Sequence, residues 1–151
     1  MLFTKSAEYA LRAMAHLASY PQGTLLMAKQ IAKEAKLPSQ FLAKLLQHLA
    51  QKGLLRSVKG PRGGFGLVPR AAQIRLADVL QSFDPGACER ACPLGEPRCE
   101  APGCQMHDGW EALHSLIIKY LEQTTLADIS PLRPSRSPIP SAFSARSKGS
   151  R

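Results

Sequence analysis

Residues 37–68 have the sequence LPSQFLAKLLQHLAQKGLLRSVKGPRGGFGLV, and this stretch decides the fold. In its first half, apolar residues recur at three- and four-residue steps, which predicts a helix with Ser39 as N-cap that stops at Gly53. The side chains that this helix should bury are Phe41, Leu42, Leu45, Leu46 and Leu49. The second half predicts two strands, Leu54–Val58 and Phe65–Val68, because KGPRGG between them has the proline and paired glycines of a tight turn.

The segments on either side extend this pattern. Upstream, the apolar spacing predicts a helix over Ser6–Ala18 and a short one over Met27–Ala35. Two helices joined by a short turn and followed by a hairpin are the order of a winged helix-turn-helix. Downstream, helices are expected over Ile74–Phe83 and Met106–Gln123, with a proline- and glycine-rich loop over 85–103 between them. The predicted fold class is mainly α with a small β-hairpin: a winged helix-turn-helix plus a long C-terminal dimerisation helix.

The predicted organisation has three parts. Residues 1–70 form the winged helix-turn-helix, residues 71–130 hold a helix, the cysteine-rich loop and the dimerisation helix, and residues 131–151 form a basic tail with few apolar residues, expected to be disordered. No apolar run approaches the ~20 residues that span a bilayer, and the N-terminus lacks the pattern of a signal peptide. We therefore expect a cytoplasmic protein that does not bind membranes.

The net charge of +9 is unevenly distributed. Residues 1–70 carry eleven Lys or Arg and two acidic side chains, whereas residues 71–130 carry four and nine. A basic first part predicts a surface for a polyanion, and the acidic second part predicts a different role. A basic protein that is simply soluble would be the alternative.

The predicted binding surface for double-stranded DNA lies on the second helix of the pair and on the hairpin. The major groove admits one α-helix, where Gln can bond adenine and Lys can reach guanine or a phosphate. A glycine-rich turn lets the backbone approach the duplex, and its cations can bind phosphate. An ordinary solvated face, or a module that binds protein, would be the alternative. The predicted contacts are Ser39, Gln40, Ala43, Lys44, Gln47, Lys59, Arg62 and Gly63.

All four cysteines fall within seventeen residues, from Cys88 to Cys104. In an intracellular chain such clustering predicts metal or redox chemistry rather than structural disulfides. Thiolates favour iron–sulfur clusters, zinc or copper(I). Three possibilities follow: an iron–sulfur cluster, a structural zinc ion, and a thiol switch or inert loop without metal. No base and orienting partner accompany these thiols, so we expect no enzyme.

The sequence resembles the IscR/NsrR-type (Rrf-two) family of bacterial winged-helix regulators. TKSAEYALRAMAHLA, at residues 4–18, and the stretch 37–68 carry the likeness, and GLLRSVKGPRGGFGL is its most specific part. The likeness runs from about Met1 to Ile129. It implies a homodimer that binds palindromic promoter sites, commonly as a repressor. It also implies that iron–sulfur status, nitric oxide or redox state is sensed through a bound cluster.

The same resemblance implies a ligand set. CPLGEPRCEAPGCQMH supplies Cys92, Cys99, Cys104 and His107, although its gaps are six and four residues where the family pattern has five and five. Cys88 is an additional possible ligand, and Glu8 matches an acidic residue that in some relatives reaches the partner subunit's cluster. A [2Fe–2S] cluster is favoured over [4Fe–4S], with zinc as the alternative. Glu8 could instead be a surface charge, and His107 could simply begin the following helix.

The helix Met106–Gln123 has a wide apolar stripe, so we expect it to pack against its twofold mate. Packing onto the first helix of the same chain is the alternative, and the two are compatible. The predicted interface residues are Trp110, Leu113, Ile117 and Tyr120.

Overall fold

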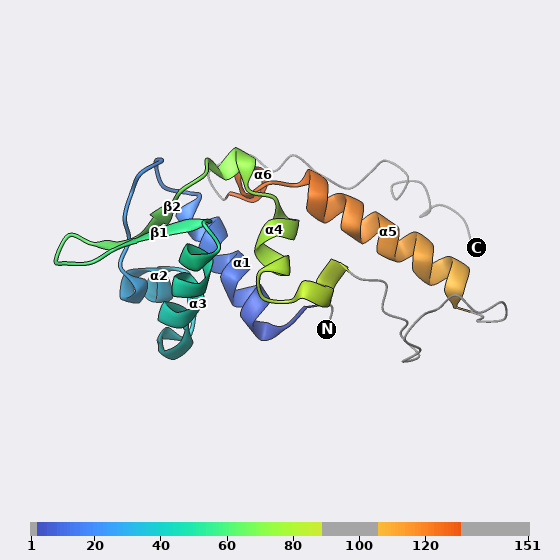
Figure 1. The fold of residues 1–151 in the computed structure, drawn as a ribbon, viewed down its shortest axis with the longest axis horizontal. Helices are drawn as coiled ribbons and strands as arrows, with labels where there is room; N and C mark the ends of the chain where they lie inside the picture. The colour runs from blue at the N-terminus through green and yellow to red at the C-terminus, as the bar shows by residue number, and fades with distance from the viewer. Residues whose placement is uncertain (1–2, 89–105, 131–151) are drawn as a thin grey trace, which may run out of the picture.

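The computed structural model describes residues 3–88 and 106–130 (Figure 1). The first three helices form one group and are followed by a two-stranded hairpin, and the remaining helices complete the chain. The elements are α1 (Lys5–Leu17), α2 (Ala28–Glu34), α3 (Ser39–Gln51), β1 (Leu55–Val58), β2 (Gly64–Leu67), η1 (Ala71–Gln73), α4 (Leu76–Gln81), η2 (Pro85–Cys88), α5 (His107–Gln123) and α6 (Leu126–Ile129). This order confirms a mainly α fold class with a small β-hairpin, and α1 and α2 lie within one residue of their expected limits. That the last long helix forms a dimer stays a prediction.

Helix α1 is the centre of the packing, with α2 and α3 on one side and α4 on the other (Figure 1). Its N-cap is Thr4, whose Oγ1 accepts a hydrogen bond from the Ala7 amide at 3.3 Å. Its buried positions are mostly alanines, and such small side chains let neighbouring helices come close. The residues that α1 buries are Ala7, Ala10, Ala13, Met14 and Leu17.

Helix α3 buries fewer residues than the sequence predicts. Leu42, Leu46 and Leu49 are buried, whereas Phe41 is 61% exposed, so the prediction that Phe41 is buried is wrong. At 100° per residue, Phe41 lies about 80° outside the narrow stripe that these three leucines define. Pro38 is the N-cap, so Ser39 is the first residue of the helix rather than its cap.

The hairpin is antiparallel, with Leu55 opposite Leu67 and Val58 opposite Gly64. It is also tied to the chain before α2. Leu26 and Phe65 exchange two main-chain hydrogen bonds, of 3.0 and 2.8 Å, so residue 26 acts as a short third strand. The wing and the helix-turn-helix are therefore joined through main-chain atoms.

The predicted helix over Ile74–Phe83 is shorter than expected. Ile74 accepts a bond from the Leu126 amide, and the Leu76 amide donates to Thr124, each at 2.9 Å. Residues 74 and 75 are therefore extended, and α4 begins only at Leu76. Helix α6 was not predicted, because this pairing joins segments fifty residues apart.

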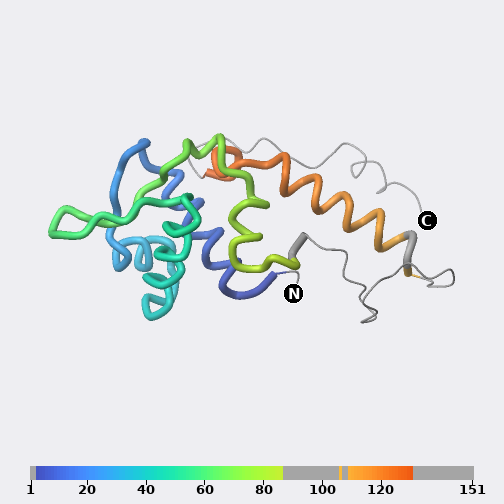
Figure 2. Tube along the Cα trace, in the orientation of Figure 1, coloured from blue at the N-terminus to red at the C-terminus, as the bar shows by residue number. Residues whose placement is uncertain are grey.

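Helix α5 leads away from the rest of the molecule (Figures 1 and 2). Near its C-terminal end Leu121 is buried, and Ile117 and Tyr120 pack against the core. Leu113, two turns earlier, is 45% exposed. Only part of the apolar stripe of α5 is thus covered by its own chain. Within the described residues, no helix is both long and apolar enough to cross a membrane.

Candidate nucleic-acid interface

All five α3 residues predicted to contact DNA are exposed. Gln40, Lys44 and Gln47 follow one another at four- and three-residue steps, on the side of α3 opposite the buried leucines. Ser39 and Ala43 lie nearer the edge of this side. The packing that buries Leu42, Leu46 and Leu49 thus directs two amides and one ammonium group outward.

The wing supplies two further cations. Lys59 and Arg62 are exposed in the turn between β1 and β2, which projects from the end of the molecule opposite α5 (Figure 1). Gly63 is buried instead, and its amide donates to the Gly60 carbonyl at 3.0 Å. A Cβ at Gly63 would lie 2.0 Å from the Val58 oxygen. Gly63 therefore shapes the turn that presents Lys59 and Arg62.

Three basic residues near this surface were not among the predicted contacts. Lys29 and Lys33 are exposed one turn apart on α2, the helix that crosses the DNA backbone in this motif. Arg56 of β1 is exposed and donates to the Gly23 carbonyl at 3.0 Å. The four-residue spacing of the two lysines was the available signal, but it is also typical of any solvated helix face.

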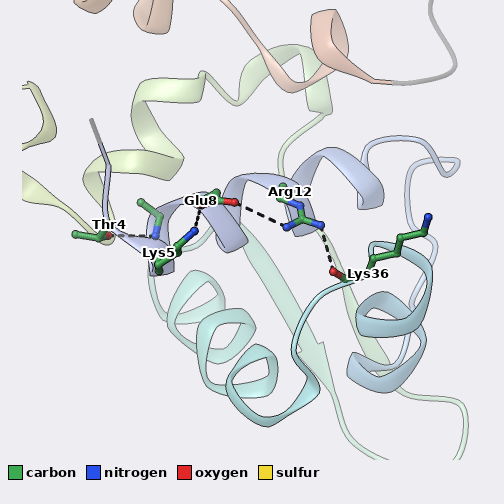
Figure 3. Close-up of polar contacts among 6 residues, drawn as sticks. Thr4, Lys5, Glu8, Arg12 and Lys36 are labelled. Carbon is green, nitrogen blue, oxygen red and sulfur yellow. Dashed lines mark hydrogen bonds and ion pairs between the residues drawn. The ribbon is translucent and has the colours of Figure 1, made fainter. Parts of the chain in front are cut away.

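A cation of α1 holds the turn between α2 and α3. The Arg12 guanidinium donates to the Ala35 carbonyl at 2.9 Å and to the Lys36 carbonyl at 3.2 Å, and Figure 3 shows the second of these bonds. These carbonyls end α2, where no helical partner is available. Lys36 has φ +54°, the left-handed conformation that ends the helix. Arg12 thereby stabilises the turn from which α3 starts.

Glu8 lies beside Arg12 on the surface of α1 (Figure 3). Its carboxylate is 3.0 Å from the Lys5 ammonium and 3.9 Å from Arg12, with the Glu8 side chain 41% exposed. Glu8 is thus a surface charge paired with two cations, which was the alternative to a role as a ligand. Its role as a ligand to a partner subunit's cluster stays a prediction.

A carboxylate of α2 makes the second link to α1. Glu34 accepts hydrogen bonds from Tyr20 at 2.6 Å and Gln30 at 2.9 Å, and its other close neighbour is the His16 ring nitrogen at 2.7 Å. These bonds favour the ionised carboxylate and lower the pKa of Glu34 from 4.5 to about 2, with Tyr20 as the largest cause. The same bond raises the pKa of Tyr20.

Glu34→Gln should therefore reduce stability in a pH-dependent way. A carboxyl with a depressed pKa in the folded state contributes stability above its unfolded pKa, and loses it as the pH falls through the folded value. The difference in unfolding free energy between wild type and variant should be full at pH 6 and shrink from about pH 4.5 toward pH 2. Urea denaturation at several pH values measures it.

Tyr20→Phe is the matched variant, because it removes the largest cause of the shift and keeps the ring. The pH-dependent part of the stability should become smaller in this variant. An equal difference between wild type and Glu34→Gln at pH 6 and pH 2.5 would contradict the role of Glu34.

The predicted metal ligands fall mostly outside the described residues. Cys92, Cys99 and Cys104 lie there, whereas Cys88 ends η2 and His107 begins α5. Among the side chains that the structure describes, which include neither Cys88 nor His107, no three of His, Cys, Asp or Glu are grouped to hold a metal. As a donor set, three or four thiolates and an imidazole suit an iron–sulfur cluster or zinc.

The predicted dimer residues divide into two pairs on α5. Ile117 and Tyr120 are half-buried against their own core, which agrees with the alternative of packing on the same chain. Trp110 and Leu113 lie nearer the N-terminal end of α5. There the Trp110 ring centre is 6.3 Å from that of His114. The role of these four residues in a dimer interface stays a prediction.

Comparison with known proteins places the chain among transcription regulators. A family model described as Rrf2, iron-dependent transcriptional regulator, matches residues 3–131. A helix-turn-helix-type regulator of Aquifex aeolicus is 36% identical over 132 residues, covering 85% of this chain and 91% of the relative. Another, MT1325 of Mycobacterium tuberculosis, is 37% identical over 131 residues, covering 86% and 81%. These relatives are regulators rather than enzymes, as expected.

Solved structures agree with the fold. CymR, the global cysteine regulator of B. subtilis, superposes with a TM-score of 0.73 at 22% identity, covering 87% of this chain and 98% of CymR. IscR of T. potens superposes with a TM-score of 0.65 at 25% identity, covering 83% of each chain. The chain therefore belongs to the Rrf2 family of transcriptional regulators, with the winged helix-turn-helix fold of that family.

Proposed function

We propose that this Rrf2-family regulator is a cytoplasmic homodimeric repressor whose affinity for palindromic promoter DNA depends on ligation of its cysteines. The observation that carries the DNA part is the exposed side of α3, where Gln40, Lys44 and Gln47 lie together, near a wing with Lys59 and Arg62 at its turn. This side has hydrogen-bonding groups for base edges, and the wing has cations for phosphates.

An iron–sulfur cluster, [2Fe–2S] in preference to [4Fe–4S], is the proposed ligand of Cys92, Cys99, Cys104 and His107. The composition of the donor set and membership of a family described as iron-dependent support it. A bound cluster would supply iron that reacts with oxidants and nitric oxide. The alternative is a zinc-stabilised or thiol-switch regulator, because three thiolates and an imidazole can complete a tetrahedral zinc site and thiols can be oxidised reversibly.

The chain's own residues would connect the cysteine segment to the DNA surface. The segment follows η2 and precedes α5, and α4 packs on both α1 and α5. In turn, α1 holds the helix-turn-helix through Arg12 and through the contact of His16 with Glu34. We propose that α5 pairs with its twofold mate, with Trp110 and Leu113 at the contact. The two α3 helices would then lie about 34 Å apart, one turn of DNA.

Protein purified without air should contain iron and sulfide in a fixed ratio to the chain, with broad absorption between about 300 and 450 nm. Cys92→Ala should lose this absorption and the dependence of operator affinity on the cluster, while the winged helix still binds DNA. Metal analysis, absorption spectra and fluorescence anisotropy with operator DNA measure these results.

Cys88→Ala is the matched control, because the resemblance does not require Cys88, and it should keep the absorption. Colourless protein loaded with zinc would favour the alternative. Protein with neither iron nor zinc, and with an operator affinity that Cys92→Ala leaves unchanged, would remove metal sensing from the proposed function.

A further inference from the structure

The side chain of His48, on one flank of α3, contacts the C-terminal end of α4. Its ring Nε2 lies 2.7 Å from the main-chain oxygen of Ser82, thirty-four residues away. Phe83 packs on the same ring, with centroids 4.8 Å apart at an angle of 52°. His48 is half-buried, and at 100° per residue it lies on the flank of α3 between the buried leucines and the exposed Lys44.

The chemistry of the contact fixes the direction of the hydrogen bond. A carbonyl oxygen only accepts, so His48 carries a proton on Nε2 and donates it to Ser82. The Ser82 hydroxyl donates to the Asp78 carbonyl at 2.8 Å, and the Asp84 amide donates to Leu80 at 2.9 Å. The carbonyl that His48 contacts is therefore held within a well-bonded end of α4.

This contact lies close in the chain to the cysteine-rich segment. Ser82 lies three residues before η2, which ends at Cys88, where the cysteine-rich segment begins. On the other side, α3 is one continuous helix of thirteen residues. A displacement of the end of α4 would thus act directly on α3. A short hydrogen bond depends on distance and angle, whereas an apolar contact can slide.

We propose that His48 is a positioning residue that transmits the state of the cysteine segment to α3 through the Ser82 carbonyl. The proposal rests on the proposed function, since it assigns the path by which cysteine ligation changes DNA affinity. The loss of His48 should reduce the difference in DNA affinity between the ligated and unligated protein, more than it reduces the affinity itself.

The test uses the full chain, with operator affinity measured in the absence of air before and after reconstitution with iron and sulfide. His48→Ala should reduce the ratio of the two affinities by about three- to tenfold relative to wild type. His48→Gln should restore most of it, because the glutamine amide can donate to the same carbonyl. Leu45→Ala is the matched control, since it removes apolar volume from the same flank of α3 and keeps the histidine.

Hydrogen exchange of the α3 amides gives a second readout that does not depend on DNA. In wild type and His48→Gln, reconstitution should change the exchange of these amides, and in His48→Ala the change should be absent. A wild-type ratio of one would overturn the proposed function and this proposal together. A normal wild-type ratio that His48→Ala retains, or that Leu45→Ala reduces equally, would overturn the role of His48 alone.

Discussion

Replacing Gly66 with alanine should lower the free energy of unfolding by about 2–3 kcal/mol, because the new methyl group has no space. Gly66 is buried in β2, and a Cβ there would lie 2.5 Å from the Thr24 oxygen and 3.1 Å from the Leu25 side chain. Backbone atoms at that distance must move, so the strand should separate from the segment before α2. Urea denaturation followed by circular dichroism measures the loss.

The same substitution at Gly109 is the matched control. Nothing lies within 4 Å of a Cβ at this exposed position of α5, and alanine is the better helix former. Gly109→Ala should therefore raise the unfolding free energy by up to about 1 kcal/mol. The proposed close contact of the wing would be contradicted if Gly66→Ala left stability unchanged or raised it as Gly109→Ala does.

Reversing two charges, Lys44→Glu with Arg62→Glu, should weaken operator binding by at least about 100-fold, because each residue is expected to contact the duplex from a different element. Lys44 lies on the exposed side of α3 and Arg62 in the wing turn. Each neutral variant alone should cost about tenfold. If Arg62 binds a phosphate, Arg62→Gln should also reduce the slope of log affinity against log salt by about one. Anisotropy titrations at several salt concentrations measure both quantities.

A distant charge reversal separates contact from net charge. Lys119 is exposed on α5, which leads away from the end of the molecule that carries the wing (Figure 1). Lys119→Glu changes the net charge as much as either single reversal and should alter affinity only slightly at moderate salt. If Lys119→Glu weakened binding as strongly as Lys44→Glu, the predicted binding surface would be wrong.

Several parts of the fold followed from local sequence signals. The leucine spacing of residues 39–51 predicted α3, and KGPRGG between two apolar runs predicted the hairpin. Both signals depend on residues a few positions apart, so they can be interpreted without knowledge of the rest of the chain. The same leucine pattern overestimated burial at Phe41, because periodicity marks an apolar side but not how much of it a neighbour covers.

Other parts required contacts between distant segments. Main-chain hydrogen bonds between residues 74–76 and 124–126 make α4 shorter than the sequence predicts. Helix α6 begins at the end of this pairing, and the sequence did not indicate it. The bonds from Arg12 to the turn before α3, and from His48 to Ser82, join residues 23 to 34 positions apart. No local pattern marks such pairs.

The sequence by itself determined the helix-hairpin order, the concentration of basic residues in positions 1–70 and the gathering of four thiols between two helices. Only the tertiary structure decided which side of α3 is free, how the wing is tied to the chain before α2, and which carbonyls Arg12 and His48 hold. The physical reason is a difference between two interactions. Hydrophobic burial is non-directional and leaves a periodic record in sequence, whereas a hydrogen bond needs a particular distance and angle that only packed neighbours supply.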